Sequence, residues 1–184
     1  MLRVSSGKVK GKKLFVPKGQ KVRPTTARVK QSIFDTIYDF SNIVVLDIFA
    51  GSGALGIESL SRGADHVTFI ENDLEVIELL KKNIESCNLA SQYSIIPFHY
   101  SKAIKNLIKK TCYFDLIFID PPFSLYETKK AEELIEQGAC LLKDGGLMIV
   151  EHTKSLEHQN SKFLISTKKY GSNFVSFIKH NESG

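Results

Sequence analysis

The segment Asp120-Pro121-Pro122-Phe123 combines residue types that are suited to chemistry on a planar amine. It follows an apolar run over residues 116–119, which has the composition of a buried strand. Neither proline has a backbone N–H and each has a fixed φ, so the loop after this strand is stiff. Such a loop can hold the Asp120 carboxylate and the Pro121 carbonyl against an amino group while the Phe123 ring stacks beside it. These four residues are the candidate catalytic group.

A second segment has the spacing of a cofactor-binding loop. Residues 47–56 read DIFAGSGALG, and the three glycines match GxGxxG between an apolar strand and a helix. Glu71 ends the next predicted strand, 20 residues after Gly51, which is the spacing of dinucleotide-binding folds. A carboxylate at Asp47 would repel a pyrophosphate but would attract a cationic group.

Because residues 120–123 also have no role in hydride transfer, S-adenosylmethionine (SAM) is favoured over a nicotinamide cofactor. We expect Glu71 to accept hydrogen bonds from the SAM ribose and Asp47 to face the SAM amine, directly or through water. The candidate SAM-binding residues here are Asp47, Phe49, Ala50, Gly51, Ser52, Gly53, Glu71 and Asn72.

Strands alternate with helices along most of the chain. Strands are expected at 43–49, 66–70, 94–98, 115–119, 147–150, 163–167 and 174–178, and helices at 25–40, 51–61, 73–87, 103–110 and 129–142. This order predicts a Rossmann-like α/β fold with a doubly wound, mostly parallel, seven-stranded sheet. Asp47, Glu71 and Asp120 would each lie at the carboxyl end of a strand, where open α/β sheets bind ligands.

Positive charge is concentrated at the start of the chain. The net charge is +5, yet residues 1–30 contain ten Lys/Arg and no Asp/Glu, whereas the remaining residues contain 15 basic and 20 acidic side chains. This distribution indicates either a polyanion partner or a solvated basic tail. Interspersed apolar and glycine residues predict a basic β-hairpin extension at 1–22, followed by a single domain at 23–184.

The candidate RNA-binding residues belong to this basic segment and to the start of the first helix. Arg23 and Arg28 have an alternative role, which is to brace that helix against the glycine loop. The set is Lys10, Lys12, Lys13, Arg23, Thr25, Arg28 and Lys30.

Several classes of protein are disfavoured by the composition. No apolar run reaches the length of a membrane span, and the first residues have no apolar signal core, so a cytoplasmic location is expected. The three cysteines are widely spaced without CxxC, and the five histidines have no ligand spacing. Neither a disulfide framework nor a metal site is therefore expected.

Four segments occur in an order that resembles the RsmD family, whose members are SAM-dependent guanine-N2 methyltransferases of small-subunit (16S) ribosomal RNA. They are residues 23–30 (RPTTARVK), 46–56 (LDIFAGSGALG), 70–73 (IEND) and 119–123 (IDPPF). The resemblance runs from about Arg3 to Glu151. It implies a class I methyltransferase fold, and as partner the small ribosomal subunit or its assembly intermediate.

The sequence departs from the family pattern at two places. Ala27 stands where an acidic residue is usual, and the aspartate that approaches the SAM adenine is missing, which leaves His99 or Ser101 as the candidate. Three other functions fit parts of the pattern: methylation of adenine-N6 or of a glutamine side chain, a nicotinamide dehydrogenase, and a non-catalytic RNA-binding module.

Overall fold

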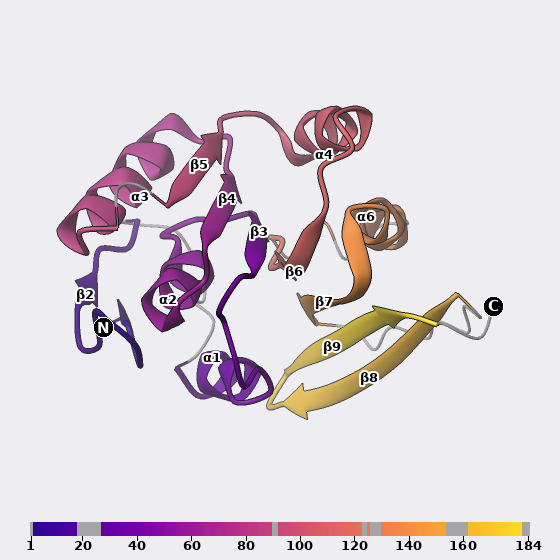
Figure 1. Cartoon of the computed structure of the whole chain (residues 1–184), viewed down its shortest axis with the longest axis horizontal. Helices are drawn as coiled ribbons and strands as arrows, with labels where there is room; N and C mark the ends of the chain where they lie inside the picture. Colours follow the sequence, from indigo (N-terminus) through magenta and orange to yellow (C-terminus); the bar gives the residue numbers. More distant parts are fainter. Residues whose placement is uncertain are drawn as a thin grey trace.

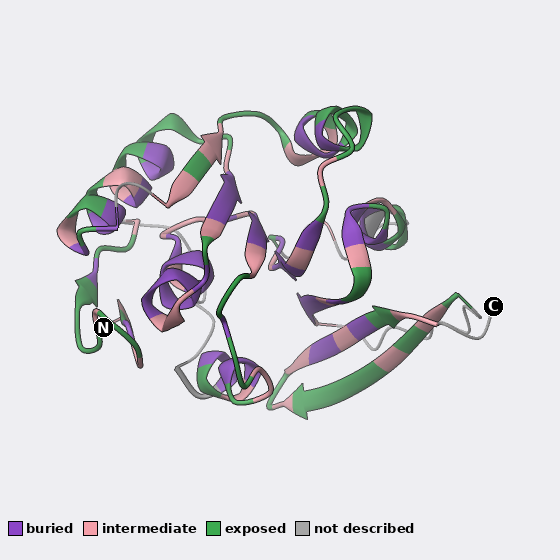
Figure 2. Cartoon of the chain, in the orientation of Figure 1, coloured by how far each residue is buried: buried purple, intermediate pink, exposed green. Residues whose placement is uncertain are grey.

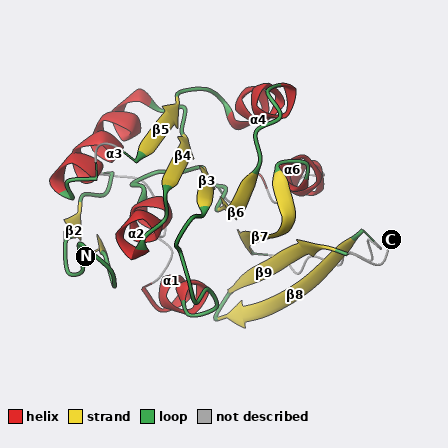
Figure 3. Ribbon diagram, viewed as in Figure 1, coloured by secondary structure: helices red, strands yellow, loops and turns green. Residues whose placement is uncertain are grey.

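The computed structural model of the protein describes residues 2–17, 27–89, 92–122, 125, 130–153 and 162–181, without the side chains of residues 27, 28, 130 and 131. After a short N-terminal strand pair, helices and strands alternate from α1 to β7, and the strands β8 and β9 follow (Figures 1 and 3). The strands are β1 Leu2–Arg3, β2 Lys13–Leu14, β3 Val44–Ile48, β4 His66–Ile70, β5 Tyr93–Ile96, β6 Phe114–Ile119, β7 Leu142–His152, β8 Phe163–Tyr170 and β9 Asn173–His180. The helices are α1 Ala27–Phe34, α2 Ala54–Arg62, α3 Leu74–Ser86, α4 Tyr100–Lys109 and α6 Lys130–Ala139.

A seven-stranded sheet forms the centre of the molecule, in the order β5-β4-β3-β6-β7-β9-β8. The first five strands are parallel, and β9 is antiparallel to both β7 and β8. This arrangement confirms the predicted doubly wound, mostly parallel fold. The order of the parallel strands reverses between β3 and β6, and such a switch point is where these sheets bind ligands.

Helices cover both faces of the sheet, and each face has its own apolar core. On one face Phe34 of α1, Leu60 of α2 and Leu80 of α3 pack with Phe69 and Phe118 of the strands. On the other face α4 and α6 pack against the alternate residues of the same strands. Burial on both faces explains why the central parallel strands β3, β4 and β6 are mostly apolar, and Figure 2 shows much of these three strands as buried.

The predicted N-terminal hairpin is present as β1 and β2, which pair antiparallel with Leu2 opposite Leu14. Leu14 and Val4 are buried, so this segment packs on the body of the protein. Val4 belongs to the same core as Phe34 and Leu60. The boundary between an extension and a domain near residue 22 falls in the part of the chain outside the described residues.

Glu58, a fully buried residue of α2, joins the N-terminal segment and α1 to α2. Its carboxylate accepts hydrogen bonds from Ser5 N and Ser5 Oγ, both at 2.7 Å, and from Ser6 N at 3.0 Å. It also forms ion pairs with Lys30 at 2.8 Å and with Arg62 at 3.0 Å. Burial raises the pKa of this carboxyl, but the bonds from Lys30 and Ser5 outweigh it and lower the pKa below its ordinary value.

This cluster corrects one of the expected RNA contacts. Lys30 is only 2% exposed, and its ammonium group also donates to the Arg3 carbonyl at 2.6 Å. It faces Glu58 in the interior, so it cannot reach a phosphate on the surface. The positive charge of Lys30 stabilises the fold by compensating the buried Glu58 carboxylate, which would be very costly if it were isolated.

Candidate active site

Three predicted carboxylates lie at one edge of the sheet. Ile48 of β3 pairs in register with Ile70 of β4 and with Ile119 of β6. The residues that follow, Glu71 and Asp120, are therefore at the same level on either side of β3. The charges of both carboxylates act on Asp47, so the three groups lie close together.

Asp47 belongs to the same group. It precedes Ile48 in β3, is only 2% exposed, and accepts a hydrogen bond from Gly56 N of α2 at 2.9 Å. Burial raises the pKa of Asp47 to about 8, and the nearby charges of Asp120 and Glu71 contribute to the increase. The three carboxylates are thus close enough to influence one another, and a cationic ligand beside Asp47 would favour its ionised form.

The raised pKa of Asp47 predicts how the stability of the ligand-free protein depends on pH. Unfolding returns the carboxyl to its ordinary value of 3.8, so the unfolded chain ionises first. Between about pH 4 and pH 8 the free energy of unfolding should fall by up to about 1.4 kcal/mol per pH unit from this group. Asn accepts the Gly56 bond without titrating, so Asp47→Asn should reduce the slope.

Urea unfolding at several pH values between about 5 and 8 measures this slope. Asp65→Asn, at an exposed position before β4, is the matched control and should leave the slope as in the unaltered protein. An equal slope in the Asp47→Asn protein would contradict a buried, protonated carboxyl.

Glu71 fixes the glycine loop and the turn after β4. One carboxylate oxygen accepts from Gly51 N at 3.0 Å, and the other accepts from Asn72 N at 2.8 Å and Asp73 N at 3.0 Å. A carboxylate offers about four lone-pair sites, so Glu71 has capacity for one further donor. The expected bond from a ribose hydroxyl stays a prediction, and Asn72 and Ser52 lie in the two segments that flank it.

The glycines allow close packing around the loop. A Cβ atom at Gly56 would lie 2.2 Å from Cε1 of Phe69, so α2 can pack on β4 only with glycine there. Gly51 has φ +55°, and a Cβ atom there would meet only the Phe49 carbonyl oxygen, at 3.9 Å. Phe49 also has a positive φ, 66°, which is unusual for a bulky residue, and with Ala50 it donates to the Ile70 carbonyl at 3.1 Å.

An aromatic group lies beside the loop at the end of β5. The Phe49 ring is 4.9 Å from the Tyr100 ring, which is 4.4 Å from the His99 ring, between centroids. His99 Nδ1 and Ser101 Oγ form a hydrogen bond of 2.9 Å. The structure thus brings Phe49 and His99 into contact with Tyr100, a residue absent from the sequence-based site. Which of His99 and Ser101 faces the adenine stays a prediction.

The predicted catalytic loop begins directly at the end of β6. Asp120 is half-buried, Pro121 is buried and Pro122 is exposed. The Pro122 carbonyl accepts a hydrogen bond from Leu125 N at 2.9 Å. Phe123 lies outside the described residues.

The candidate RNA contacts are only partly described. Lys10, Lys12 and Lys13 are exposed on the N-terminal segment, where Arg3 donates to the Gly11 carbonyl at 2.9 Å and closes the hairpin. Arg23 and Thr25 lie outside the described residues, as does the side chain of Arg28.

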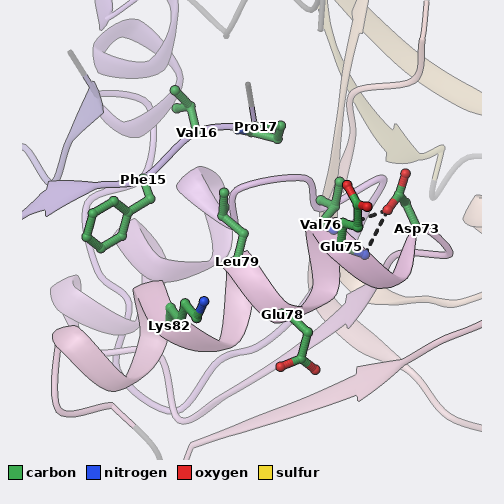
Figure 4. A pocket seen from close by; sticks show the side chains of 9 residues that line it. All are labelled: Phe15, Val16, Pro17, Asp73, Glu75, Val76, Glu78, Leu79 and Lys82. Atoms are coloured by element: carbon green, nitrogen blue, oxygen red, sulfur yellow. Dashed lines mark hydrogen bonds between the residues drawn. The ribbon is translucent and has the colours of Figure 1, made fainter. Parts of the chain in front are cut away.

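A groove of about 650 Å³ lies between residues 15–17 and α3 (Figure 4). Asp73 lines this groove at the start of α3. Its side chain caps the helix by accepting hydrogen bonds from Glu75 N and Val76 N, and its N–H donates to Glu71. Its lining combines apolar and charged side chains: Phe15, Val16, Pro17, Asp73, Glu75, Val76, Glu78, Leu79 and Lys82.

Metal-ligand clusters and membrane-spanning helices are both absent from the described residues. Across the described ranges, no group of three His, Cys, Asp or Glu side chains could hold a metal ion. Among the helices in the same part of the chain, none has the length and apolar character to cross a membrane.

Comparison with known proteins identifies the family. A family model described as "Conserved hypothetical protein 95" matches residues 2–179. YlbH of Bacillus subtilis is 36% identical over 182 residues, which cover 97% of this chain and 98% of that one. Ribosomal RNA small subunit methyltransferase D of Escherichia coli is 35% identical over 154 residues, 82% of this chain and 71% of that one.

A solved structure agrees with the sequence relatives. A protein of Thermus thermophilus superimposes with a TM-score of 0.84 at 28% identity, covering 97% of this chain and 99% of that one. With a family match over nearly the whole chain and relatives above one third identity, the chain belongs to the RsmD family of SAM-dependent methyltransferases.

Proposed function

We propose that this protein transfers a methyl group from SAM to the exocyclic N2 amine of a guanine in small-subunit ribosomal RNA. The relatives named as ribosomal RNA small subunit methyltransferases support the choice of RNA. One observation supports the chemistry: Asp120 follows β6 at the level of Glu71, beside the glycine loop. The proposed setting is the cytoplasm, on the subunit or its assembly intermediate.

The residues of the loop edge fit SAM. The acidic group of Asp47, Glu71 and Asp120 suits a cationic ligand that has no phosphate. Gly51, where a Cβ atom would have only one neighbouring atom within 4 Å, suits a ligand that lies against the backbone. When bound, SAM supplies an electrophilic methyl group on a sulfonium.

The proposed task of residues 120–123 is to position the amine. The guanine amine is a weak nucleophile because its lone pair is delocalised into the ring. Asp120 and the Pro121 carbonyl would accept its two N–H bonds, which favours a pyramidal nitrogen with its lone pair directed at the methyl carbon. The carboxylate also stabilises the positive charge that develops on the nitrogen. The released proton passes to Asp120 or to water.

The target base must leave its stack to enter such a site, and single-stranded loops of RNA make this less costly. Phe123, outside the described residues, is proposed to stack on the base, a contact worth about 1–3 kcal/mol.

The test uses small ribosomal subunits from a strain that lacks this protein. They are incubated with methyl-labelled SAM, and the RNA is digested to nucleosides. The label should appear in N2-methylguanosine. Label in N6-methyladenosine or in a protein would contradict the proposal, and tight NAD binding without SAM binding would exclude methyl transfer altogether.

Replacing Lys10, Lys12 and Lys13 together by alanine should weaken subunit binding and flatten its dependence on salt. Each lost phosphate contact lowers the slope of log K against log salt by about 0.7–0.9, so a change of up to about 2–3 in the slope is expected. Filter binding over a range of about 50–200 mM salt measures the change.

Three exposed lysines of α4 and its end provide the control, since Lys105, Lys109 and Lys110 replaced by alanine remove the same charge elsewhere. Equal slopes for the two triple variants would mean that the N-terminal lysines are only a solvated tail.

A further inference from the structure

Asn83 is a fully buried polar residue on the apolar side of α3, one turn after Leu80. Its neighbours Ile77, Leu80 and Ile84 are buried apolar residues. A side-chain amide in such a place needs hydrogen-bond partners, since leaving it without them is costly.

The amide of Asn83 connects two segments that are far apart in the sequence. Its Oδ1 accepts from Phe15 N at 2.8 Å. Its Nδ2 donates to the Phe15 carbonyl and to the Ser52 carbonyl, both at 2.9 Å. Both Nδ2 hydrogens are thus used, which fixes the orientation of the amide.

The Ser52 bond reaches the loop that lies beside the carboxylates. Ser52 stands between Gly51, whose N–H is held by Glu71, and Gly53. A Cβ atom at Gly53 would lie 2.3 Å from Cδ1 of Leu80, so the loop rests directly on α3. Asn83 and Leu80 therefore support the loop from one side while Glu71 holds it from the other.

The Phe15 bonds reach the basic N-terminal segment. Phe15 directly follows β2, which ends at Leu14 and includes the exposed Lys13. Asn83 binds both the N–H and the carbonyl of Phe15, which is the pair of hydrogen bonds that a residue of an adjacent antiparallel strand would make. The Phe15 ring itself is 62% exposed and forms one wall of the groove beside α3 (Figure 4).

We infer that Asn83 is a positioning residue that couples RNA binding at the N-terminal segment to SAM binding at the glycine loop. The coupling rests on the proposed function, because it requires RNA at residues 10–13. A ligand at either segment would favour the conformation in which the Asn83 bonds are formed, and these bonds hold the other segment in the position that its own ligand requires. Such coupling is reciprocal: each ligand raises the affinity of the other by the same factor.

The test measures the Kd of S-adenosylhomocysteine by calorimetry on the full chain, with and without unmethylated small ribosomal subunits. For the unaltered protein the subunits should lower this Kd by about fivefold or more, the range of typical couplings. Asn83→Asp keeps the volume but sets a carboxylate against two carbonyl oxygens. It should raise the Kd by about tenfold, and the ratio with and without subunits should fall to about one.

Asn106→Asp is the matched control, because it makes the same change at an exposed position of α4. It should retain the full ratio. If Asn83→Asp does not fold, Asn83→Ser, which cannot span both segments, gives the same test. A merely structural role would lower the melting temperature and leave the ratio unchanged, and that result would overturn the inference.

The two proposals fail in different ways. If the unaltered protein does not bind subunits, both the RNA assignment and the coupling are wrong. If subunits bind and are methylated while Asn83→Asp retains the unaltered ratio, only the role of Asn83 is wrong. An unchanged Kd without subunits in that variant would show that Asn83 does not support the loop.

Discussion

Replacing Asp120 by asparagine is expected to lower kcat for methyl transfer by about 10³-fold. The variant retains an acceptor of the same shape but loses the charge that stabilises the developing positive nitrogen. The Kd of S-adenosylhomocysteine should change by less than about threefold, because the loss acts in the transition state rather than in cofactor binding. Single-turnover methylation of subunits measures the rate, and calorimetry measures the affinity.

Asp115→Asn makes the same change near the other end of β6, where Asp115 pairs with Lys143 at 2.9 Å. This control should keep nearly full activity. Full activity of Asp120→Asn would remove the carboxylate from the mechanism and leave positioning by the proline loop as the main contribution. Since the charge of Asp120 raises the pKa of Asp47, the variant should also titrate Asp47 at a lower pH.

Glu58→Ala is expected to have the largest effect on stability. It leaves Lys30 buried without its carboxylate and removes the acceptor of Ser5 and Ser6. Breaking a buried ion pair in this way costs about 3–5 kcal/mol, which corresponds to a fall in melting temperature on the order of 10 °C for a chain of this length. Thermal unfolding followed by circular dichroism measures it.

Two comparisons make this prediction specific. Glu78→Ala removes an exposed ion pair with Lys81 on α3 and should leave the melting temperature nearly unchanged, because exposed pairs contribute little. Combining Glu58→Leu with Lys30→Met should destabilise less than Glu58→Ala, because no buried charge is left alone. A similar loss in all three variants would mean that the ion pair contributes little.

The stabilisation by Glu58 also has a defined pH dependence. The lowered pKa of Glu58 means that the folded protein keeps this carboxylate ionised at a pH where the unfolded chain binds a proton. The contribution is therefore complete above the ordinary glutamate pKa and is lost as the pH falls through the folded value. This acid dependence is opposite in sign to that of Asp47.

The arrangement of the sheet could be predicted because its causes are local. The central parallel strands β3, β4 and β6 are mostly apolar, and burial on both faces requires this pattern. The level of Glu71 and Asp120 then followed from the rule that parallel strands end at one edge. The first helix was predicted to continue to about Phe40, yet α1 ends at Phe34. Phe40 lies in the non-helical segment after α1, and its ring stacks on the Phe34 ring with 5.6 Å between the centroids. The apolar pattern therefore continues beyond the end of the helix.

The strand β7 was also longer than expected. It begins at Leu142 and includes Gly145 and Gly146, whereas the pattern predicts a strand over 147–150 alone. Gly145 has φ +72°, and the pairing with β6 shifts register between Phe114 and Leu116. A pair of glycines can lie inside an irregular strand or in the loop before a strand. Amino-acid composition alone does not distinguish these two cases.

Contacts between distant residues could not be predicted in the same way. Lys30 belongs to a basic run that suggested RNA, and its partner Glu58 lies 28 residues further along the chain. Asn83 offered a weaker signal, namely a polar residue among the apolar positions of a regular amphipathic helix. Its partners Phe15 and Ser52 become apparent only when the chain is folded.

The antiparallel pair β8–β9 has a consequence for biosynthesis. The apolar strand β7 has β6 on one side and receives its other partner only from β9, which is translated later. Until then β7 presents an open edge to other nascent chains, a recognised route to aggregation. The same hairpin places Tyr170 against Ser32 of α1, so α1 gains this hydroxyl contact only after β8 has been synthesised.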